Sequence, residues 1–307
     1  MTSALVSNIP KCCVYDGPGL RTVVFTMGCP LRCKWCQNPE NLAMKPVVLF
    51  DPEKCAACGR CLPYCEKQCG RMTPKGLVID RADCIGCGAC AEHCYPEART
   101  LCGGRRSVDE VFEAVMRDQV FYRTSGGGVT LSGGEPTMHA EFCIELFRRL
   151  HEAGVHTALE TCGFCQPDTM RRIAQHTDLF LYDFKALSEP VHQQWTAQSN
   201  AVILENMKML HDLGKEIIIR IPLIPGVNDG TEFQRMMAHL QTMERLNRVH
   251  ILPFHQIGSS KYLLSDIPYE LAEMEECSVE YAQEHARYAE SCGFEVNIGG
   301  WDAGGTH

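Results

Sequence analysis

The sequence lacks long apolar runs, an excess of basic residues and the start typical of a secreted protein. None of its apolar runs approaches the length of about 20 residues that a membrane-spanning helix needs. A formal net charge of -9 over 307 residues argues against a nucleic-acid or anionic-membrane partner. The opening MTSALVSNIPKCC has neither the basic start nor the apolar core of a signal peptide, so we expect a cytoplasmic protein.

Cysteine, by contrast, is abundant, with 20 residues. In a long chain without a signal peptide, this abundance indicates metal binding more than disulfides. Eleven of the cysteines form one compact group of three and two groups of four, and the other nine are scattered. For scattered residues such as Cys12, Cys13, Cys143, Cys277 and Cys292, we favour the role of a small buried hydrophobe. So many thiolate-rich groups indicate the cytosol of an anaerobe.

The first group lies in the segment GCPLRCKWCQNPE, residues 28–40. Cys29, Cys33 and Cys36 have the spacing C-x3-C-x2-C. Three thiolates on one tight loop can hold three irons of a cubane [4Fe–4S] cluster, whereas such clusters normally have four cysteine ligands. One iron would then be open to another ligand. The spacing alone also allows a structural zinc loop or three buried thiols.

Two further groups lie within residues 50–102, and each matches the bacterial ferredoxin run C-x2-C-x2-C-x3-C. The runs are Cys55, Cys58, Cys61, Cys65 and Cys84, Cys87, Cys90, Cys94. In a two-cluster ferredoxin the fourth cysteine of each run ligates the other cluster, so we expect Cys94 with the first run and Cys65 with the second. Cys69 lies close enough to replace Cys65. All-cysteine zinc sites are the alternative, although tandem runs of this kind are rarely zinc.

Outside this segment, β-branched apolar runs alternate with amphipathic stretches. After a polar lead-in over residues 1–19, the predicted strands are residues 20–26, 129–131, 157–160, 179–184, 217–221, 249–254 and 294–298. The predicted helices are residues 107–122, 140–152, from 167, 201–213, 231–245 and 269–291. The pattern predicts an α/β fold, a partial (β/α)6 TIM-type barrel of residues 1–49 and 103–307, with a 2[4Fe–4S] ferredoxin-like domain inserted at 50–102. A doubly wound sheet also fits the pattern.

Polar residues follow the predicted strands, at the end where parallel α/β folds bind ligands. The segment SGGEP, residues 132–136, follows the second strand; paired glycines let a ligand approach the backbone, and Glu135 can accept from a cationic group. Asp183 and Lys185 lie on one side of the fourth strand, an expensive pair to bury unless it meets a charged ligand. A surface ion pair is the alternative.

Two further polar residues lie on the fifth and sixth strands. Arg220 interrupts the aliphatic run IIIRIPLIPG, and a long cation there either reaches the rim or binds an anion. His255 follows the sixth strand at the mouth of the predicted barrel. A lone histidine is usually structural, but this position favours a ligand contact.

In this order, six segments resemble motifs of the glycyl-radical-enzyme activating enzymes, a radical S-adenosylmethionine (SAM) family that includes pyruvate formate-lyase activating enzyme. They are DGPGLR (16–21), GCPLRCKWCQNPE (28–40), SGGEP (132–136), ETCG (160–163), YDFK (182–185) and LPFHQIG (252–258). The resemblance covers nearly the whole chain, and the insert is typical of larger members with two auxiliary clusters. It implies three [4Fe–4S] clusters, reductive cleavage of SAM, and removal of a Cα hydrogen from one glycine of a partner glycyl radical enzyme.

The resemblance also implies a role for each matching residue. Cys29, Cys33 and Cys36 would hold the SAM cluster; Trp35, Cys36 and Gln37 would lie along the adenine; Gly133, Gly134 and Glu135 would surround the methionine amino group; Asp183, Phe184 and Lys185, with Arg220, would surround the carboxylate end; Glu160 and Thr161 would lie near a monovalent cation; and His255 would contact the ribose. The DGPGLR segment would face the glycine loop of the partner. The family often has aspartate where this chain has Glu160, and the longer arm alters the expected cation site.

The resemblance further implies reduced flavodoxin or ferredoxin as electron donor. A monomer is expected, because the target must dock over the open barrel. One alternative is a radical SAM enzyme that acts on a small molecule or another peptide. The other is an iron–sulfur electron-transfer module, which would need a fourth cysteine ligand such as Cys12, Cys13 or Cys69 for the first group. The sequence does not name the partner.

Overall fold

The computed structural model describes residues 2–74 and 76–300, so the outer limits predicted for the barrel, at residue 1 and within 301–307, lie outside the described residues. Seven parallel strands of a nine-stranded sheet are neighbours in chain order. They are β2 (Arg21–Thr26), β8 (Gly128–Gly133), β9 (His156–Thr161), β10 (Leu179–Asp183), β11 (Glu216–Leu223), β12 (Arg248–Pro253) and β13 (Glu295–Ile298). All seven predicted strands are confirmed. Because the strand order never reverses, the doubly wound alternative is wrong.

Two antiparallel strands extend the sheet beyond β2. β1 (Ser3–Asn8) pairs with β2, and β7 (Gly104–Ser107) pairs with β1. The prediction of a polar lead-in over residues 1–19 is therefore wrong at its start. Ala4, Leu5 and Val6 are buried, because their apolar side chains complete the core at this edge.

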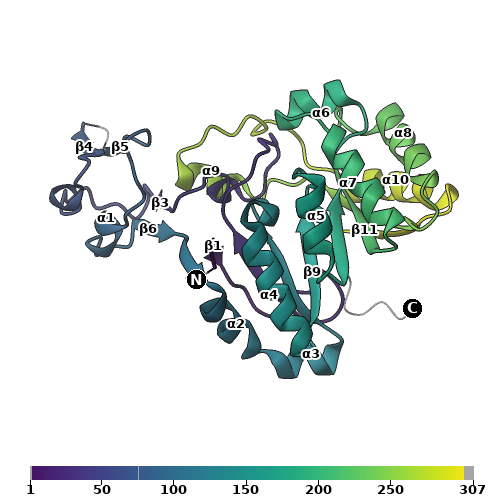
Figure 1. Cartoon of the computed structure of the whole chain (residues 1–307). Helices are drawn as coiled ribbons and strands as arrows, with labels where there is room; N and C mark the ends of the chain where they lie inside the picture. Colours follow the sequence, from purple (N-terminus) through teal and green to yellow (C-terminus); the bar gives the residue numbers. More distant parts are fainter. Residues whose placement is uncertain (1, 75, 301–307) are drawn as a thin grey trace.

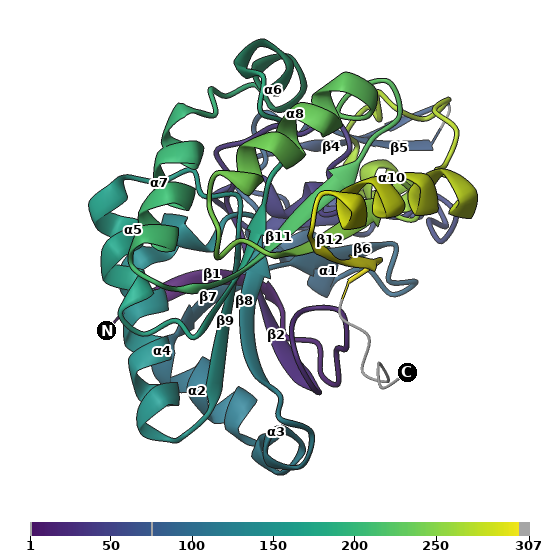
Figure 2. The ribbon, with the colours of Figure 1, turned by 90° about the vertical axis from the view of Figure 1, so that its right-hand side faces the viewer.

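Helices line one face of the curved sheet, and Figure 2 shows several of them side by side along it. They are α2 (Val108–Met116), α3 (Gln119–Ser125), α4 (Ala140–Glu152), α5 (Pro167–Ala174), α6 (Glu189–Thr196), α7 (Ala201–Asp212), α8 (Gly230–Gln241) and α10 (Val279–Ser291), with a short α9 (Ser259–Ser265) elsewhere. The main core lies between this layer and the sheet, where Leu146 of α4 and Met236 of α8 join Ile219 of β11. None of the helices in the described part of the chain is long and apolar enough to cross a membrane.

Two predicted helices differ from the structure. The predicted helix 107–122 is divided into α2 and α3 near Asp118, whose side chain accepts hydrogen bonds from Lys11 and Thr22. The predicted helix 269–291 begins only at Val279, because the Ser278 side chain accepts from the Tyr281 amide and caps it there. The short helices α6 and α9 were not predicted.

The cysteine-rich segment lies beside the sheet (Figure 1). Its β3 (Val47–Phe50) and β6 (Arg99–Cys102) are antiparallel and lead out to a hairpin and one helical turn. These are β4 (Gly70–Thr73), β5 (Gly76–Ile79) and α1 (Ala89–Glu92). A 3-10 turn at Leu62–Tyr64 lies in the same segment, whereas those at Pro39–Asn41 and Pro136–His139 lie outside it. Little regular structure therefore supports this segment.

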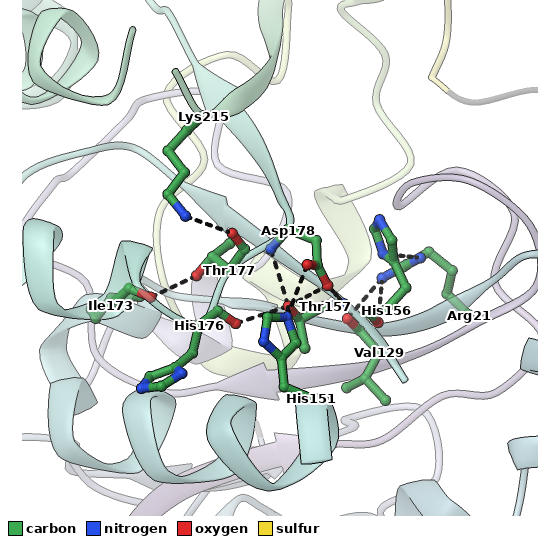
Figure 3. Close-up of polar contacts among 10 residues, drawn as sticks. All are labelled: Arg21, Val129, His151, His156, Thr157, Ile173, His176, Thr177, Asp178 and Lys215. Carbon is green, nitrogen blue, oxygen red and sulfur yellow. Dashed lines mark hydrogen bonds and ion pairs between the residues drawn. The ribbon is translucent and has the colours of Figure 1, made fainter. Parts of the chain in front are cut away.

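A polar network closes the amino ends of the strands, opposite the edge where the predicted site residues lie (Figure 3). The Thr157 amide and hydroxyl donate to Asp178 Oδ2 at 2.8 and 3.0 Å, and His151 Nε2 lies 2.9 Å from Asp178 Oδ1. Burial raises the pKa of Asp178, but these hydrogen bonds outweigh it and the net pKa lies below the ordinary value. The ionised carboxylate thus joins the start of β9 to the start of β10.

We expect Asp178→Asn to lower the free energy of unfolding by about 1–2 kcal/mol at pH 7. The hydrogen bonds to the ionised Asp178 carboxylate stabilise the fold at pH values above the ordinary aspartate pKa. This contribution is lost as pH falls through the lower pKa of the folded state. Anaerobic urea unfolding at a series of pH values measures the difference between variant and parent, which should shrink toward acid pH. Glu205→Gln, at an exposed site on α7, is the control. A difference that grows on acidification would contradict this role.

Candidate functional site

A cavity of about 450 Å³ lies at the carboxyl ends of the parallel strands. It is lined by Asp16, Phe25, Cys29, Leu31, Cys33, Trp35, Cys36, Gln37, Asn38, Ser132, Gly133, Gly134, Glu160, Thr161, Cys162, Asp183, Lys185, Arg220, Pro222, Ile224, Leu252, Pro253, Phe254, His255 and Gly299. The cavity therefore brings together the first cysteine group and the strand-end residues that the sequence singled out. Two of those residues, Glu135 and Phe184, do not line it.

The loop with the first three cysteines begins directly after β2 and is held on two sides. The Gly28 amide donates to Asn41 O at 2.7 Å, and the Arg32 amide donates to Thr196 O at 2.8 Å. Burial raises the pKa of Cys33 to about 12 and that of Cys36 to about 11. Positive charge, such as that of bound iron, is needed to keep such thiols as thiolates.

The paired glycines after β8 serve the packing of this loop. A Cβ on Gly133 would lie 2.3 Å from the Thr26 backbone, and one on Gly134 would lie 2.3 Å from Gly28 O. The backbone that needs the space is therefore the chain's own. Both glycines also line the cavity, where the sequence predicts that a ligand approaches their backbone.

The carboxylate of Glu135 is fully buried and is used within the protein. Its Oε1 accepts from the Thr137 amide and hydroxyl and from the Thr161 hydroxyl at 2.7 Å, and its Oε2 accepts from the Cys162 amide at 2.7 Å. Its own amide donates to Gly28 O at 2.7 Å. This residue therefore fastens the ends of β8 and β9 to the cysteine loop, and its carboxylate does not reach the cavity.

Two ion pairs lie in the wall of the cavity. Lys185 Nζ lies 2.8 Å from Asp183 Oδ2, and Arg220 Nη1 lies 3.0 Å from Glu160 Oε1. Burial favours the neutral amine of Lys185, but Asp183 and Cys33 outweigh it, so the net pKa of Lys185 is raised. Both cations therefore keep their charge in a site that can bind an anion.

Arg220 also has unused hydrogen-bonding capacity. Its Nε is buried and has no hydrogen-bond partner among the described residues. A buried donor without a partner is costly, and a carboxylate of a ligand in the cavity that Arg220 lines would offer an acceptor. The amino-acid end of SAM carries such a carboxylate, and the donor set of the cavity therefore fits that cofactor.

Several cavity residues were not predicted as ligand contacts, among them Asp16, Ser132 and Cys162. Asp16, which we had expected to face a partner, lies in the wall; burial raises its pKa, while Arg220 and Arg21 oppose the rise. The Ser132 hydroxyl donates to Glu160 Oε2 at 2.5 Å. Cys162 is buried and lines the cavity with Cys29. Ser132 and Cys162 lie within the SGGEP and ETCG motifs, next to predicted site residues. This position in the sequence is the signal that could have identified them.

The opposite wall is largely apolar. Trp35 packs in a cluster with Ile224 and Phe254, and the ring of Trp195 lies 6.2 Å away, centroid to centroid. Gln37 Nε2 donates to His255 O at 3.3 Å, which joins the cysteine loop to the end of β12. This wall offers a flat, apolar surface of the kind that a nucleobase packs against. Phe184, by contrast, belongs to the main core.

The cysteines of the insert surround two small spaces. One is lined by Cys55, Cys58, Cys61 and Cys94, and the other by Cys84, Cys87, Cys90, Cys65 and Cys69. The last cysteine of each run thus meets the first three of the other. Within the described ranges, no group of three or more His, Cys, Asp or Glu side chains is arranged to hold a single metal ion. The first space has the four thiols that a [4Fe–4S] cluster takes, and the second has five candidates for four positions.

The cysteine at position 65 has the environment of a ligand. The Cys69 amide donates to Cys65 Sγ at 3.3 Å, and backbone N–H groups of this kind commonly support ligand sulfurs. Burial raises the pKa of Cys65, but hydrogen bonds from Cys69 and Lys67 outweigh it, and the net pKa is lowered. Burial raises the pKa of Cys69 to about 11.

Comparisons with known proteins agree with this geometry. The profile of the Radical SAM superfamily matches residues 84–240, and that of a 4Fe-4S single cluster domain matches residues 15–68. The chain is 41% identical to the trans-4-hydroxy-L-proline dehydratase activating enzyme of Clostridioides difficile, over 96% of this chain and 99% of that protein. It is 37% identical to the benzylsuccinate synthase activating enzyme of Thauera aromatica, over 98% and 94% respectively.

A solved structure extends the comparison to the fold. SuiB of Streptococcus suis, bound to the precursor peptide SuiA, matches with a TM-score of 0.51 at 12% identity, over 93% of this chain and 49% of that chain. At this identity the likeness shows the fold alone. The relatives above are far closer in sequence and cover nearly the whole chain. The chain therefore belongs to the radical SAM superfamily and, within it, to the activating enzymes of glycyl radical enzymes.

Proposed function

We propose that the chain binds SAM in the cavity and uses it to remove a Cα hydrogen from one glycine of a partner glycyl radical enzyme. The observation that carries the proposal is the meeting of Cys29, Cys33 and Cys36 with two buried cations at one cavity. A [4Fe–4S] cluster held there would supply the single electron that cleaves SAM, leaving methionine and, once the glycine hydrogen has been taken up, 5′-deoxyadenosine.

The chain's own residues orient SAM. Lys185 and Arg220 bind its carboxylate, and the backbone at Gly133 and Gly134 lies by its amino group. Trp35, Gln37 and His255 form the wall for its adenosine. The family resemblance implies a monovalent cation near Glu160 and Thr161, and the carboxylate of Glu160 pairs with Arg220.

We further propose that the curved sheet is a partial (β/α)6 barrel, built from the described residues up to 49 and from 103 onward. Residues 50–102 form the inserted ferredoxin-like domain. Its two spaces would hold auxiliary [4Fe–4S] clusters, one on Cys55, Cys58, Cys61 and Cys94 and one on Cys84, Cys87, Cys90 and Cys65. The crosswise meeting of the two cysteine runs supports this assignment.

The partner is defined here only by its class. The named relatives activate different enzymes, among them a trans-4-hydroxy-L-proline dehydratase, a choline trimethylamine-lyase and a benzylsuccinate synthase. The cavity binds the shared cofactor, so its residues do not select among such targets. We propose reduced flavodoxin or ferredoxin as the electron donor and a monomer in the cytosol as the working form.

The proposal is tested by incubating anaerobically reconstituted protein with dithionite and SAM. We expect 5′-deoxyadenosine, and with a matching partner a glycine-centred doublet in electron paramagnetic resonance (EPR) spectra. Cys33→Ala should lose both and about a third of the iron, because one of three cubes is lost. Cys292→Ala, at the end of α10 and outside the cavity lining, is the matched control and should retain 5′-deoxyadenosine. No 5′-deoxyadenosine from the parent protein would leave only electron transfer.

Removing the guanidinium group of Arg220 should weaken SAM binding. We expect Arg220→Met to raise the dissociation constant of SAM by about 10- to 100-fold, because a charge-assisted hydrogen bond to the carboxylate is lost. Titration of the EPR signal of the reduced protein with SAM measures this constant. Arg171→Met, at an exposed site on α5, should bind SAM like the parent. Unchanged affinity in Arg220→Met would exclude this residue from the carboxylate site.

Cys65 and Cys69 are the two candidates for the fourth ligand at the second space of the insert. We expect Cys65→Ala to lose the iron of one cluster, whereas Cys69→Ala keeps it, since Cys69 contributes its backbone amide and alanine retains that group. Iron and sulfide analysis after reconstitution measures the difference. The reverse pattern, with iron lost only from Cys69→Ala, would assign Cys69 as the ligand.

A further inference from the structure

The short helix α9 is bonded to the loop that carries the third cysteine of the first group. The Tyr262 hydroxyl donates to Cys36 O at 2.9 Å. The neighbouring Lys261 Nζ donates to Gln37 O at 3.1 Å and to Asn38 Oδ1 at 2.6 Å. The backbone next to a proposed iron ligand therefore takes its position partly from α9.

The other end of α9 is bonded to the cysteine-rich insert. Arg81 Nη2 donates to Leu264 O at 3.3 Å, and Arg81 Nε lies 3.8 Å from the carboxylate of Asp266. Arg81 also donates to Val48 O in β3, beside the second cysteine-lined space. It precedes Cys84, the first cysteine around that space, by only three residues.

A helix of this length depends on its neighbours for stability. α9 spans Ser259–Ser265, and isolated helices shorter than about 12 residues are marginal in water. The Tyr262 ring is buried and packs 4.4 Å from the ring of Tyr269, centroid to centroid. The position of α9 is thus fixed by its neighbours: it packs against β3, Arg81 bonds to its last turn from the insert, and Lys261 and Tyr262 bond it to the cysteine loop. Figure 1 shows α9 between the sheet and the insert.

We propose that Arg81 and Tyr262 are positioning residues that transmit the order of the insert, through α9, to the loop that carries Cys36. This inference rests on the proposed function, in which that loop holds the SAM cluster and lines the adenine. When the insert is ordered, Arg81 holds the last turn of α9, and Tyr262 then holds the Cys36 carbonyl. When the contacts of Arg81 are lost, the loop gains freedom and SAM binds more weakly, although every cysteine is still present.

The test uses the full, anaerobically reconstituted protein with Arg81→Met, which keeps the aliphatic stem and removes the donors. Arg71→Met, at an exposed site on β4 of the same insert, is the matched control. We expect Arg81→Met to keep the iron content of the parent but to bind SAM about three- to tenfold more weakly in the EPR titration. Hydrogen exchange should also rise at the amides of residues 36–41, which Arg81 itself does not contact.

A second variant separates the two ends of the linkage. Tyr262→Phe removes only the hydroxyl and should weaken SAM binding in the same direction, with the insert unchanged. Should Arg81→Met lose iron, Arg81→Lys, which keeps a charge and donors, takes its place. The inference is overturned if Arg81→Met has the SAM affinity of the parent and the same hydrogen exchange at the amides of residues 36–41. Failure of the parent itself to respond to SAM or to form 5′-deoxyadenosine instead contradicts the proposed function.

Discussion

The site depends on one buried carboxylate. Glu135 is enclosed by protein and is satisfied by donors from its own turn and from the end of β9, while its amide holds the start of the cysteine loop. Three segments that are far apart in the sequence therefore meet at fixed positions. Because an unpaired buried charge is costly, loss of any of these donors would loosen the others. The glycines at 133 and 134 allow this close approach, and the cavity forms where the three segments meet.

The electrostatics of the cavity follow from that arrangement. Glu160 on β9 and Arg220 on β11 pair across the intervening β10, whose Asp183 lies beside Arg220, while Lys185 pairs with Asp183 just beyond the strand end. The wall thus holds three carboxylates, with Asp16, and two cations, and Arg220 Nε has no hydrogen-bond partner among the described residues. A zwitterionic ligand with a sulfonium group, such as SAM, meets both signs of charge at short range without leaving a large net charge buried.

Much of this was accessible from residue patterns, because buried parallel strands are continuous apolar runs and their ends carry the motifs. Other features depended on tertiary contacts that no local pattern contains. β1 was missed because a short apolar run beside polar residues gains its partners only from β2 and β7. The side chain of Glu135 was assigned to a ligand because its motif does not reveal four internal donors. The pairing of Glu160 with Arg220 depends on strand order. Residues 269–278 are rich in Glu, Leu, Ala and Met, which favour a helix, but the cap at Ser278 makes the helix begin only at Val279.

The uneven exposure of the thiols has a consequence for how the protein meets air. Cys58 and Cys87 in the insert are exposed, whereas the three cysteines of the cavity are at most half-exposed and Cys162 is buried. Before the clusters are built in, oxidants in solution therefore reach the thiols of the insert first, and accessible thiols are the first to be converted to sulfenic or higher acids. Air should therefore damage the cluster-free protein first at its periphery.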